Sequence, residues 1–237
     1  MEYKTSFFVF RGEYKMEEIN VKKELLKLRS YLMQSEEIKH RMDRIKRART
    51  FCKYLEQNDI NYDICIKHQE VLGCDESREY YKRFGEYLDS DYIICKNLLV
   101  HERKGEKRNF LIITDSKKKI DLKSLKETID SKKLEFVDKD NMKDLLNTEP
   151  GNVSLFNIMY DKEKQVNLII DEDLLTGKSL AFHPLYNGMS VFLKPTECFK
   201  FLKLIDRKCC VLPIESKQEI VDPNQNIKCR QLAKVSV

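Results

Sequence analysis

The stretch Tyr92-Ile-Ile-Cys-Lys-Asn-Leu-Leu-Val100 is an apolar run interrupted at its centre by Lys96 and Asn97. Its length and its aliphatic side chains predict a buried β-strand. A lysine inside such a strand needs an explanation, because a buried ammonium group is costly unless it is paired. Either Lys96 points outward on an edge strand and protects that edge from other chains, or it is a cationic anchor for a phosphate or a carbonyl group.

Around this strand the sequence alternates between short strands and short helices. Lys104-Gly105-Glu106 is typical of a turn, so the apolar run at 110–114 is expected to return as the second strand of a hairpin. The other expected strands are 3–10, 62–66, 134–137, 166–170, 189–193 and an edge strand at 211–214, and the expected helices are 16–32, 35–56, 75–88, 121–129, 139–146 and 195–205. This alternation predicts a mixed α/β (α+β) domain over about residues 45–215.

The charge of the chain is unevenly distributed. The 237 residues carry a formal net charge of +5, and residues 1–50 alone hold 13 Lys and Arg against 8 Asp and Glu, which accounts for all of it. Much of this excess lies in the predicted helix 35–56, on Arg41, Arg44, Lys46, Arg47 and Arg49. These residues either form a solvated helix face or contact the phosphates of a nucleic acid.

Several classes of protein are excluded by what the sequence lacks. No apolar run reaches the roughly 18 residues that a transmembrane helix needs, and the N-terminus lacks the apolar segment and cleavage site of a signal peptide. We therefore expect a soluble, cytoplasmic protein with no membrane partner. The eight cysteines contain no C-x-x-C pair, which argues against a zinc site and favours buried, reduced thiols.

Two further segments could carry chemistry. Gly151-Asn-Val-Ser154 is a glycine-led loop whose successive backbone N–H groups could bind an oxyanion, although it could equally be a plain turn. His183, between Phe182 and Pro184, is either a hydrogen-bonded core histidine or a functional group. A Ser154–His183–Asp171 triad can be drawn on paper, but no G-x-S-x-G elbow is present. No P-loop and no G-x-G-x-x-G motif occurs, so nucleotide-cofactor chemistry is not expected. The other histidines, His40, His68 and His101, show no obvious partners.

The order of these segments resembles the YbaK/prolyl-tRNA editing superfamily. The similarity rests on Lys96-Asn97-Leu98, then Glu149-Pro-Gly-Asn-Val-Ser-Leu-Phe156, then Phe182-His-Pro-Leu-Tyr-Asn187, and it covers about residues 46–214. Its nearest branch is the free-standing prolyl-tRNA-synthetase-associated alanyl-tRNA(Pro) deacylases. The resemblance implies a mixed, mostly antiparallel sheet with short surrounding helices over 46–215. Residues 1–45 would be a basic, largely helical extension, and 216–237 a polar tail.

The resemblance also implies a set of site residues. Lys96 and His183 correspond to the residues tied to activity. The substrate pocket is expected to include Asn97, Gly151, Val153, Ser154, Leu155, Phe156 and Asn187. Leu155 replaces the usual proline and Asn157 a small residue, and both departures are expected on the pocket loop, where they would affect substrate preference.

The expected activity is trans-editing: hydrolysis of a mischarged aminoacyl-tRNA, Ala-tRNA(Pro) above others, at its 3′ acceptor end. An aminoacyl ester is already activated, so hydrolysis needs positioning and charge stabilisation more than a strong nucleophile. The resemblance implies assistance by a ribose hydroxyl of the substrate, with no metal and no cofactor. Prolyl-tRNA synthetase is a possible partner. The alternatives are a non-catalytic tRNA-binding or synthetase-associated module, and a deacylase for another mischarged tRNA. The oligomeric state does not follow from the sequence.

Overall fold

The computed structural model describes residues 23, 25–28, 30, 35–71, 73–82 and 91–216. The chain divides into two compact units, Met1–Lys46 and Arg47–Val237. In the first unit, the described residues from 23 to 30 are helical. The other residues of the predicted helix 16–32, the predicted strand 3–10 and the tail from 217 lie outside the described residues.

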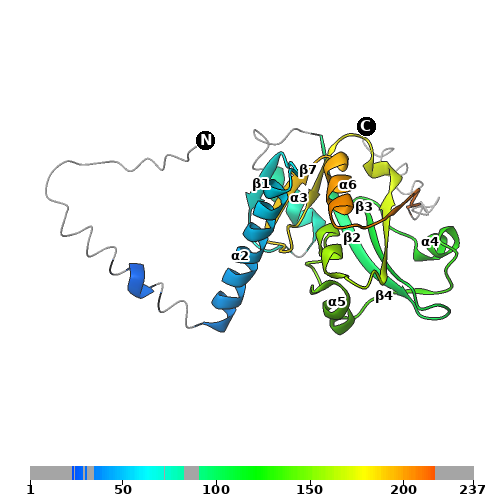
Figure 1. The fold of residues 1–237 in the computed structure, drawn as a ribbon, viewed down its shortest axis with the longest axis horizontal. Helices are drawn as coiled ribbons and strands as arrows, with labels where there is room; N and C mark the ends of the chain where they lie inside the picture. Colours follow the sequence, from blue (N-terminus) through cyan, green and yellow to red (C-terminus); the bar gives the residue numbers. More distant parts are fainter. Residues whose placement is uncertain are drawn as a thin grey trace, which may run out of the picture. The chain divides into compact units, whose positions relative to one another are not determined.

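The second unit is built on a mixed sheet (Figure 1). The helices and strands are α2 (Glu36–Gln57, which begins in the first unit), β1 (Ile64–Lys67), α3 (Cys74–Lys82), β2 (Tyr92–Glu102), β3 (Asn109–Asp115), α4 (Leu122–Thr128), β4 (Leu134–Phe136), α5 (Lys139–Leu146), β5 (Val166–Asp171), β6 (Ser179–Phe182), β7 (Met189–Leu193), α6 (Pro195–Leu204) and β8 (Cys210–Leu212), with 3₁₀ turns η1 (Leu155–Tyr160) and η2 (Glu172–Leu174).

The strand order is β1-β7-β6-β2-β3-β5-β8, with β4 also paired to β2. Four of the pairings are antiparallel (β1–β7, β2–β3, β2–β4 and β6–β7), and three are parallel (β2–β6, β3–β5 and β5–β8). The predicted fold class, a mixed and mostly antiparallel sheet with surrounding helices, is therefore confirmed.

The long strand β2 is central, and one of its edges is interrupted. On one side it pairs with β3 from Cys95 to His101. On the other side it pairs with β6 only up to Ile94 and with β4 only from Val100. Between these two points the sheet has a gap beside Cys95–Leu99. The interpretation of Lys96 as a lysine on an edge strand is wrong for the strand as a whole, because β6 and β4 both pair with the side of β2 opposite β3, although that side is unpaired beside Lys96 itself.

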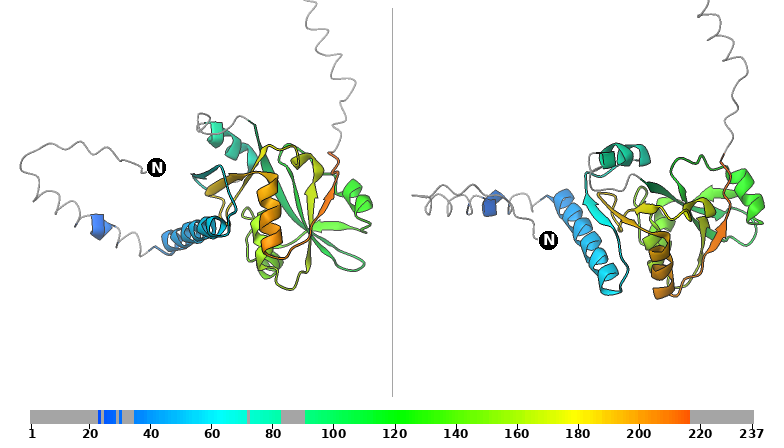
Figure 2. Two further views of the ribbon diagram at one scale, coloured as in Figure 1. Left: turned by 45° about the horizontal axis from the view of Figure 1, so that its top comes forward. Right: turned by 90° about the horizontal axis from the view of Figure 1, so that it is seen from above.

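Two cores lie on one face of the sheet, and a third group of aromatic rings lies elsewhere in the unit. Val100, Phe110 and Leu125 belong to a cluster beneath α4, whereas Ile94, Tyr81 and Phe192 belong to a second cluster beneath α3. These two helices lie toward opposite ends of the sheet (Figure 2). The third group joins Phe51 of α2, Phe156 of η1 and Phe201 of α6, with ring centroids 4.8 to 6.0 Å apart.

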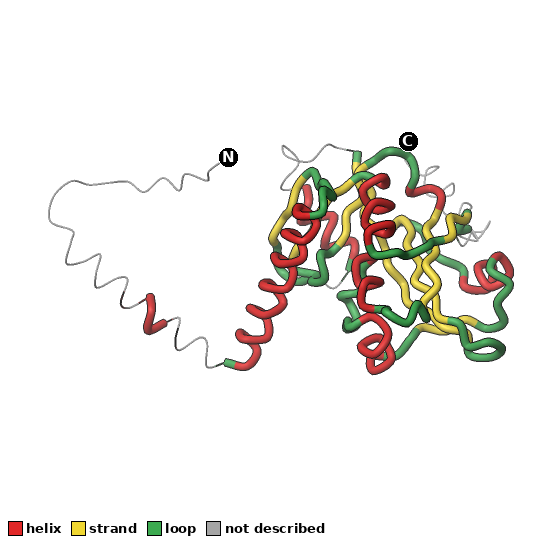
Figure 3. The backbone as a smooth tube through the Cα atoms, in the orientation of Figure 1, coloured by secondary structure: helices red, strands yellow, loops and turns green. Residues whose placement is uncertain are grey.

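Helices and strands alternate along the chain largely as the sequence predicts (Figure 3). The helix expected at 75–88 is described as far as Lys82. The sequence pattern did not reveal β6, because Ser179–Phe182 is buried on both faces and shows no alternation. Nor did it reveal the 3₁₀ turn that begins at Leu155.

Candidate active site

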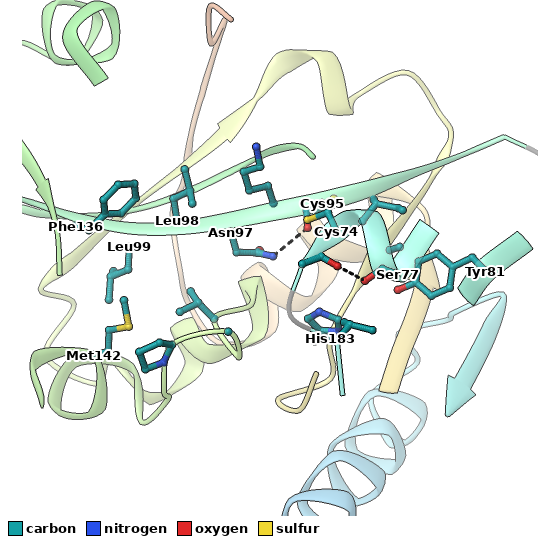
Figure 4. A pocket seen from close by; sticks show the side chains of 18 residues that line it. Cys74, Ser77, Tyr81, Cys95, Asn97, Leu98, Leu99, Phe136, Met142 and His183 are labelled. Carbon is teal, nitrogen blue, oxygen red and sulfur yellow. Dashed lines mark hydrogen bonds between the residues drawn. The ribbon is translucent and has the colours of Figure 1, made fainter. Parts of the chain in front are cut away.

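A cavity of about 270 Å³ lies against the interrupted edge of β2. Its walls come from β2, the start of α3, the loop 150–153 and the end of β6, with Phe136 and Met142 also lining it (Figure 4). This volume is close to the lower limit of small-molecule sites, about 300 Å³. Five residues expected at the site line the cavity: Lys96, Asn97, Gly151, Val153 and His183. The fold thus brings together three segments that are far apart in the sequence.

Lys96 lines the cavity, and its ammonium group is held by a backbone carbonyl. Its Nζ donates a hydrogen bond to the carbonyl oxygen of Lys118, at 2.8 Å. Lys118 is itself anchored, since its Nζ lies 2.7 Å from a carboxylate oxygen of the fully buried Asp171 and 2.6 Å from one of Asp173. An ammonium has three donors. In the described part of the chain Lys118 is the one hydrogen-bond acceptor found for Lys96, so two donors remain for a ligand.

The side chain of Asn97 connects β2 to the glycine-led loop. Its Oδ1 accepts a hydrogen bond from the N–H of Leu155, at 3.1 Å, and its Nδ2 lies 3.4 Å from the carbonyl oxygen of Cys95 (Figure 4). Asn97 therefore fixes the loop relative to the strand that carries Lys96.

The loop offers fewer free donors than the sequence suggested. The N–H of Asn152 donates to Glu149 O, and that of Ser154 donates to Asn157 Oδ1. In the part of the chain that the structure describes, the N–H groups of Gly151 and Val153 have no hydrogen-bond partner. An oxyanion could therefore use these two groups, and not a consecutive series.

Gly151 is required by its backbone conformation. Its φ of 84° is in the left-handed region, whereas a Cβ there would meet only ordinary van der Waals contact with Asn187. Asn187 in turn holds the loop, because its N–H donates to Asn152 Oδ1 and its Nδ2 donates to Val71 O. Asn187 does not line the cavity, so the structure gives it a supporting position beside the site.

Three other expected pocket residues point elsewhere. Leu155 and Phe156 are buried in the core, and Phe156 packs between the rings of Phe51, Phe182 and Phe201. The hydroxyl of Ser154 is buried and has no hydrogen-bond partner among the described residues. Asn157, the second departure from the family pattern, is also buried, and its Oδ1 accepts from the N–H of Ser154. The side chains at both departures therefore lie outside the cavity wall.

His183 lines the cavity as a neutral imidazole. Its Nδ1 lies 3.1 Å from the carbonyl oxygen of Met189, so Nδ1 carries the proton and Nε2 is an acceptor. Burial lowers the pKa of His183 to about 4, since desolvation disfavours the charged form. The Ser154–His183–Asp171 triad does not form, because Asp171 binds Thr114 and Lys118, and His183 binds a backbone carbonyl.

One face of α3 lines the cavity and was not recognised from the sequence. Cys74, Ser77 and Tyr81 are spaced i, i+3 and i+7, the spacing of one helical face, and this periodicity was the available signal. The hydroxyl of Tyr81 lies 2.5 Å from Ser190 Oγ, which lies 2.8 Å from Nε2 of His68. Burial raises the pKa of Tyr81 to about 12 and lowers that of His68. The sequence showed no obvious partner for His68, whereas the structure places it in this buried chain of hydrogen bonds.

The basic residues expected to bind tRNA all lie on α2. Arg41, Lys46, Arg47 and Arg49 are exposed, and Arg44 is partly buried. Among the described residues, no helix is both long enough and apolar enough to span a membrane. The described cysteines are free thiols, with Cys52, Cys95 and Cys198 buried and Cys210 exposed.

Comparison with known proteins gives this geometry a context. A model of the aminoacyl-tRNA editing domain matches residues 68–201. The prolyl-tRNA editing protein ProX of Acetoanaerobium sticklandii is 32% identical over 149 residues, which are 63% of this chain and 86% of that protein. The prolyl-tRNA synthetase associated domain-containing protein 1 of Danio rerio is 22% identical over 59% of this chain and 72% of its own. A crystal structure of a candidate trans-editing enzyme for prolyl tRNA synthetase superposes with a TM-score of 0.52 and 16% identity, over 72% of this chain and 97% of that one, and shows the likeness of fold.

Proposed function

Because the chain belongs to the aminoacyl-tRNA editing domain family, we propose that it hydrolyses the ester bond of a mischarged tRNA in trans, with Ala-tRNA(Pro) as the principal substrate. The observation that carries the proposal is the cavity at the gap in β2, where Lys96, the Gly151 loop and His183 meet. The names of ProX and of the zebrafish protein support the connection to prolyl-tRNA and its synthetase.

The proposed reaction is attack of water on the ester carbonyl. The water oxygen bonds to the acyl carbon, the bond from that carbon to the ribose oxygen breaks, and the ribose oxygen takes a proton. The products are the free amino acid and a tRNA with an unesterified 3′ end. The Lys96 ammonium would stabilise the negative charge that develops on the carbonyl oxygen, together with the N–H groups of Gly151 and Val153.

His183 would act by positioning in this reaction. A base whose conjugate acid has a pKa of about 4 removes a proton from water poorly near neutral pH. Its Nε2 can accept a hydrogen bond from the substrate or from the attacking water. A neighbouring ribose hydroxyl of the substrate would assist the proton transfer.

The experiment that tests this function is a deacylation assay with a panel of mischarged tRNAs. We expect the purified protein to release alanine from Ala-tRNA(Pro) faster than it releases proline from Pro-tRNA(Pro). Faster release from another mischarged tRNA would assign a different substrate. Leu155 would not explain that outcome, because its side chain lies in the core, whereas Cys74 and Ser77 line the cavity. Retained tRNA binding without turnover would favour a non-catalytic module.

The pH dependence of deacylation should lack a histidine inflection. Since burial holds the pKa of His183 near 4, the imidazole is neutral above about pH 5.5 and its protonation state does not change up to pH 8. A plot of kcat/KM against pH should therefore show no step near pH 6.5. A step there that disappears in His183→Asn would contradict this prediction.

The basic residues of α2 are proposed as the tRNA contact, with the 1–45 extension contributing to tRNA or synthetase binding. The tRNA association constant K falls as the salt concentration rises, and a plot of log K against log salt has a negative slope. Neutralising Lys46, Arg47 and Arg49 together should make this slope less steep by about one for each phosphate that the variant no longer neutralises. The matched control replaces three exposed lysines elsewhere, Lys162, Lys203 and Lys208. Filter binding over a salt series measures both slopes, and an unchanged slope for the α2 variant would exclude this helix.

A further inference from the structure

An exposed aromatic ring lines one end of the cavity. Phe136, the last residue of β4, is 60% exposed, although large aromatic side chains are usually buried. It lies opposite Val100 in the β2–β4 pairing, at the point where β4 begins to cover the edge of β2. Met142 of α5 and Leu98 line the cavity beside it. The core does not need this ring, because Leu134 of the same strand already fills the cluster beneath α4.

The two ends of the cavity differ in character (Figure 4). At one end are Ser77 and Tyr81 of α3, both 2% exposed, together with His183. At the other end are Phe136 and Met142. Asn97 lies between the ends, next to Lys96 in the strand. The cavity therefore has an enclosed polar end and an exposed apolar end, and Lys96 of β2 also lines it.

The shape of an aminoacyl-tRNA determines how it can occupy such a cavity. Its amino acid is a terminal group, so it can enter an enclosed end. The terminal nucleotide remains joined to the rest of the tRNA, so it must occupy the open end. Unpaired bases of RNA are commonly bound by stacking on aromatic side chains.

We propose that Phe136 is the stacking platform for the 3′-terminal adenine of the substrate. The ester would lie at Lys96 and the amino acid at the α3 end. This inference rests on the proposed function, since it assigns a nucleobase subsite to the same cavity. Leu98, on the same side of β2 as the ring, would form the apolar floor beside it (Figure 4).

The test compares two short esters of the amino acid that the wild-type protein releases fastest from tRNA. One is carried on adenosine 5′-monophosphate and the other on the corresponding ribose 5-phosphate without a base. We expect wild type to favour the first in kcat/KM by about 5- to 100-fold, the effect of one base–aromatic stack. Phe136→Ala should bring the ratio close to one, whereas Phe136→Tyr should preserve it. Leu204→Ala, a control on α6 that is 43% exposed and outside the cavity lining, should behave as wild type.

Two results would overturn the proposal. An unchanged ratio in Phe136→Ala means that the ring does not bind the base, and an equal loss on both esters means that it contacts the amino acid or ribose. A binding titration separates this proposal from the proposed function. The protein is titrated with the trinucleotide CCA, which carries no amino acid, and with the same oligomer lacking the last base. If wild type deacylates no mischarged tRNA but binds CCA through Phe136, the function fails and the subsite stands. If binding is also independent of Phe136, the subsite fails as well.

Discussion

Replacing Lys96 with alanine is expected to reduce kcat/KM for deacylation by about 100- to 1,000-fold, the range observed when one group that stabilises an oxyanion is removed. The side chain lies at the cavity with its ammonium on Lys118 O, and no other side chain of the described cavity lining carries a positive charge. A loss of this size would follow from the absence of a charge at the ester carbonyl. Steady-state kinetics on the preferred mischarged tRNA measures the effect.

The fold should survive this substitution, because Lys96 is only partly buried and its loss leaves one backbone carbonyl without that donor. The thermal midpoint of Lys96→Ala should therefore stay close to that of wild type. Lys203→Ala on α6 removes the same charge from an exposed site outside the cavity lining, and it should retain full activity. Turnover near the wild-type rate in Lys96→Ala would refute the proposed role of the lysine.

The largest expected effect on stability is at Asp171. Its carboxylate is fully buried and is bound by Lys118 Nζ at 2.7 Å and by Thr114 Oγ1 at 2.5 Å. Asp171→Asn keeps the shape but removes the charge that pairs with Lys118. Breaking one side of a buried ion pair costs about 3–5 kcal/mol. We expect the free energy of unfolding in urea to fall by about 3 kcal/mol.

Asp173 provides a matched control, since its carboxylate contacts the same lysine at 2.6 Å but is 63% exposed. Asp173→Asn should cost about 0–1 kcal/mol, as solvent screens exposed pairs. Equal losses in the two variants would mean that burial does not determine the strength of this network. Because Lys118 O holds the ammonium of Lys96, Asp171→Asn should also lower deacylation, whereas Asp173→Asn should affect it less.

The local features of the site were predictable because they depend on short patterns. An apolar run with Lys96 and Asn97 at its centre indicated an unusual strand, and the hairpin that follows was indicated by the turn at Gly105. The central position of β2 was not predictable. It depends on the parallel pairing with β6, a short strand without alternation that the sequence did not reveal.

The hydrogen bonds that shape the site join residues that are distant in sequence. Asn97 accepts a hydrogen bond from the N–H of Leu155, 58 positions later in the chain. His68 forms a hydrogen bond with Ser190, 122 positions later. A single sequence gives no indication of such pairs. For the same reason, the side-chain directions of Leu155 and Asn157 could not be inferred from their place on the loop.

The gap in the sheet also bears on how the protein avoids aggregation. Unpaired strand edges are templates for strands of other chains. Backbone groups of alternate residues face the same edge, and Leu99 O is bonded on the β4 side, so the N–H and C=O of Asn97 face the gap. The bare segment Cys95–Leu99 is bounded by β6 at one end and β4 at the other, which leaves no room for a foreign strand to extend along it. Among the described residues, the gap thus leaves main-chain groups of Asn97 unpaired without exposing an edge long enough to seed intermolecular sheets.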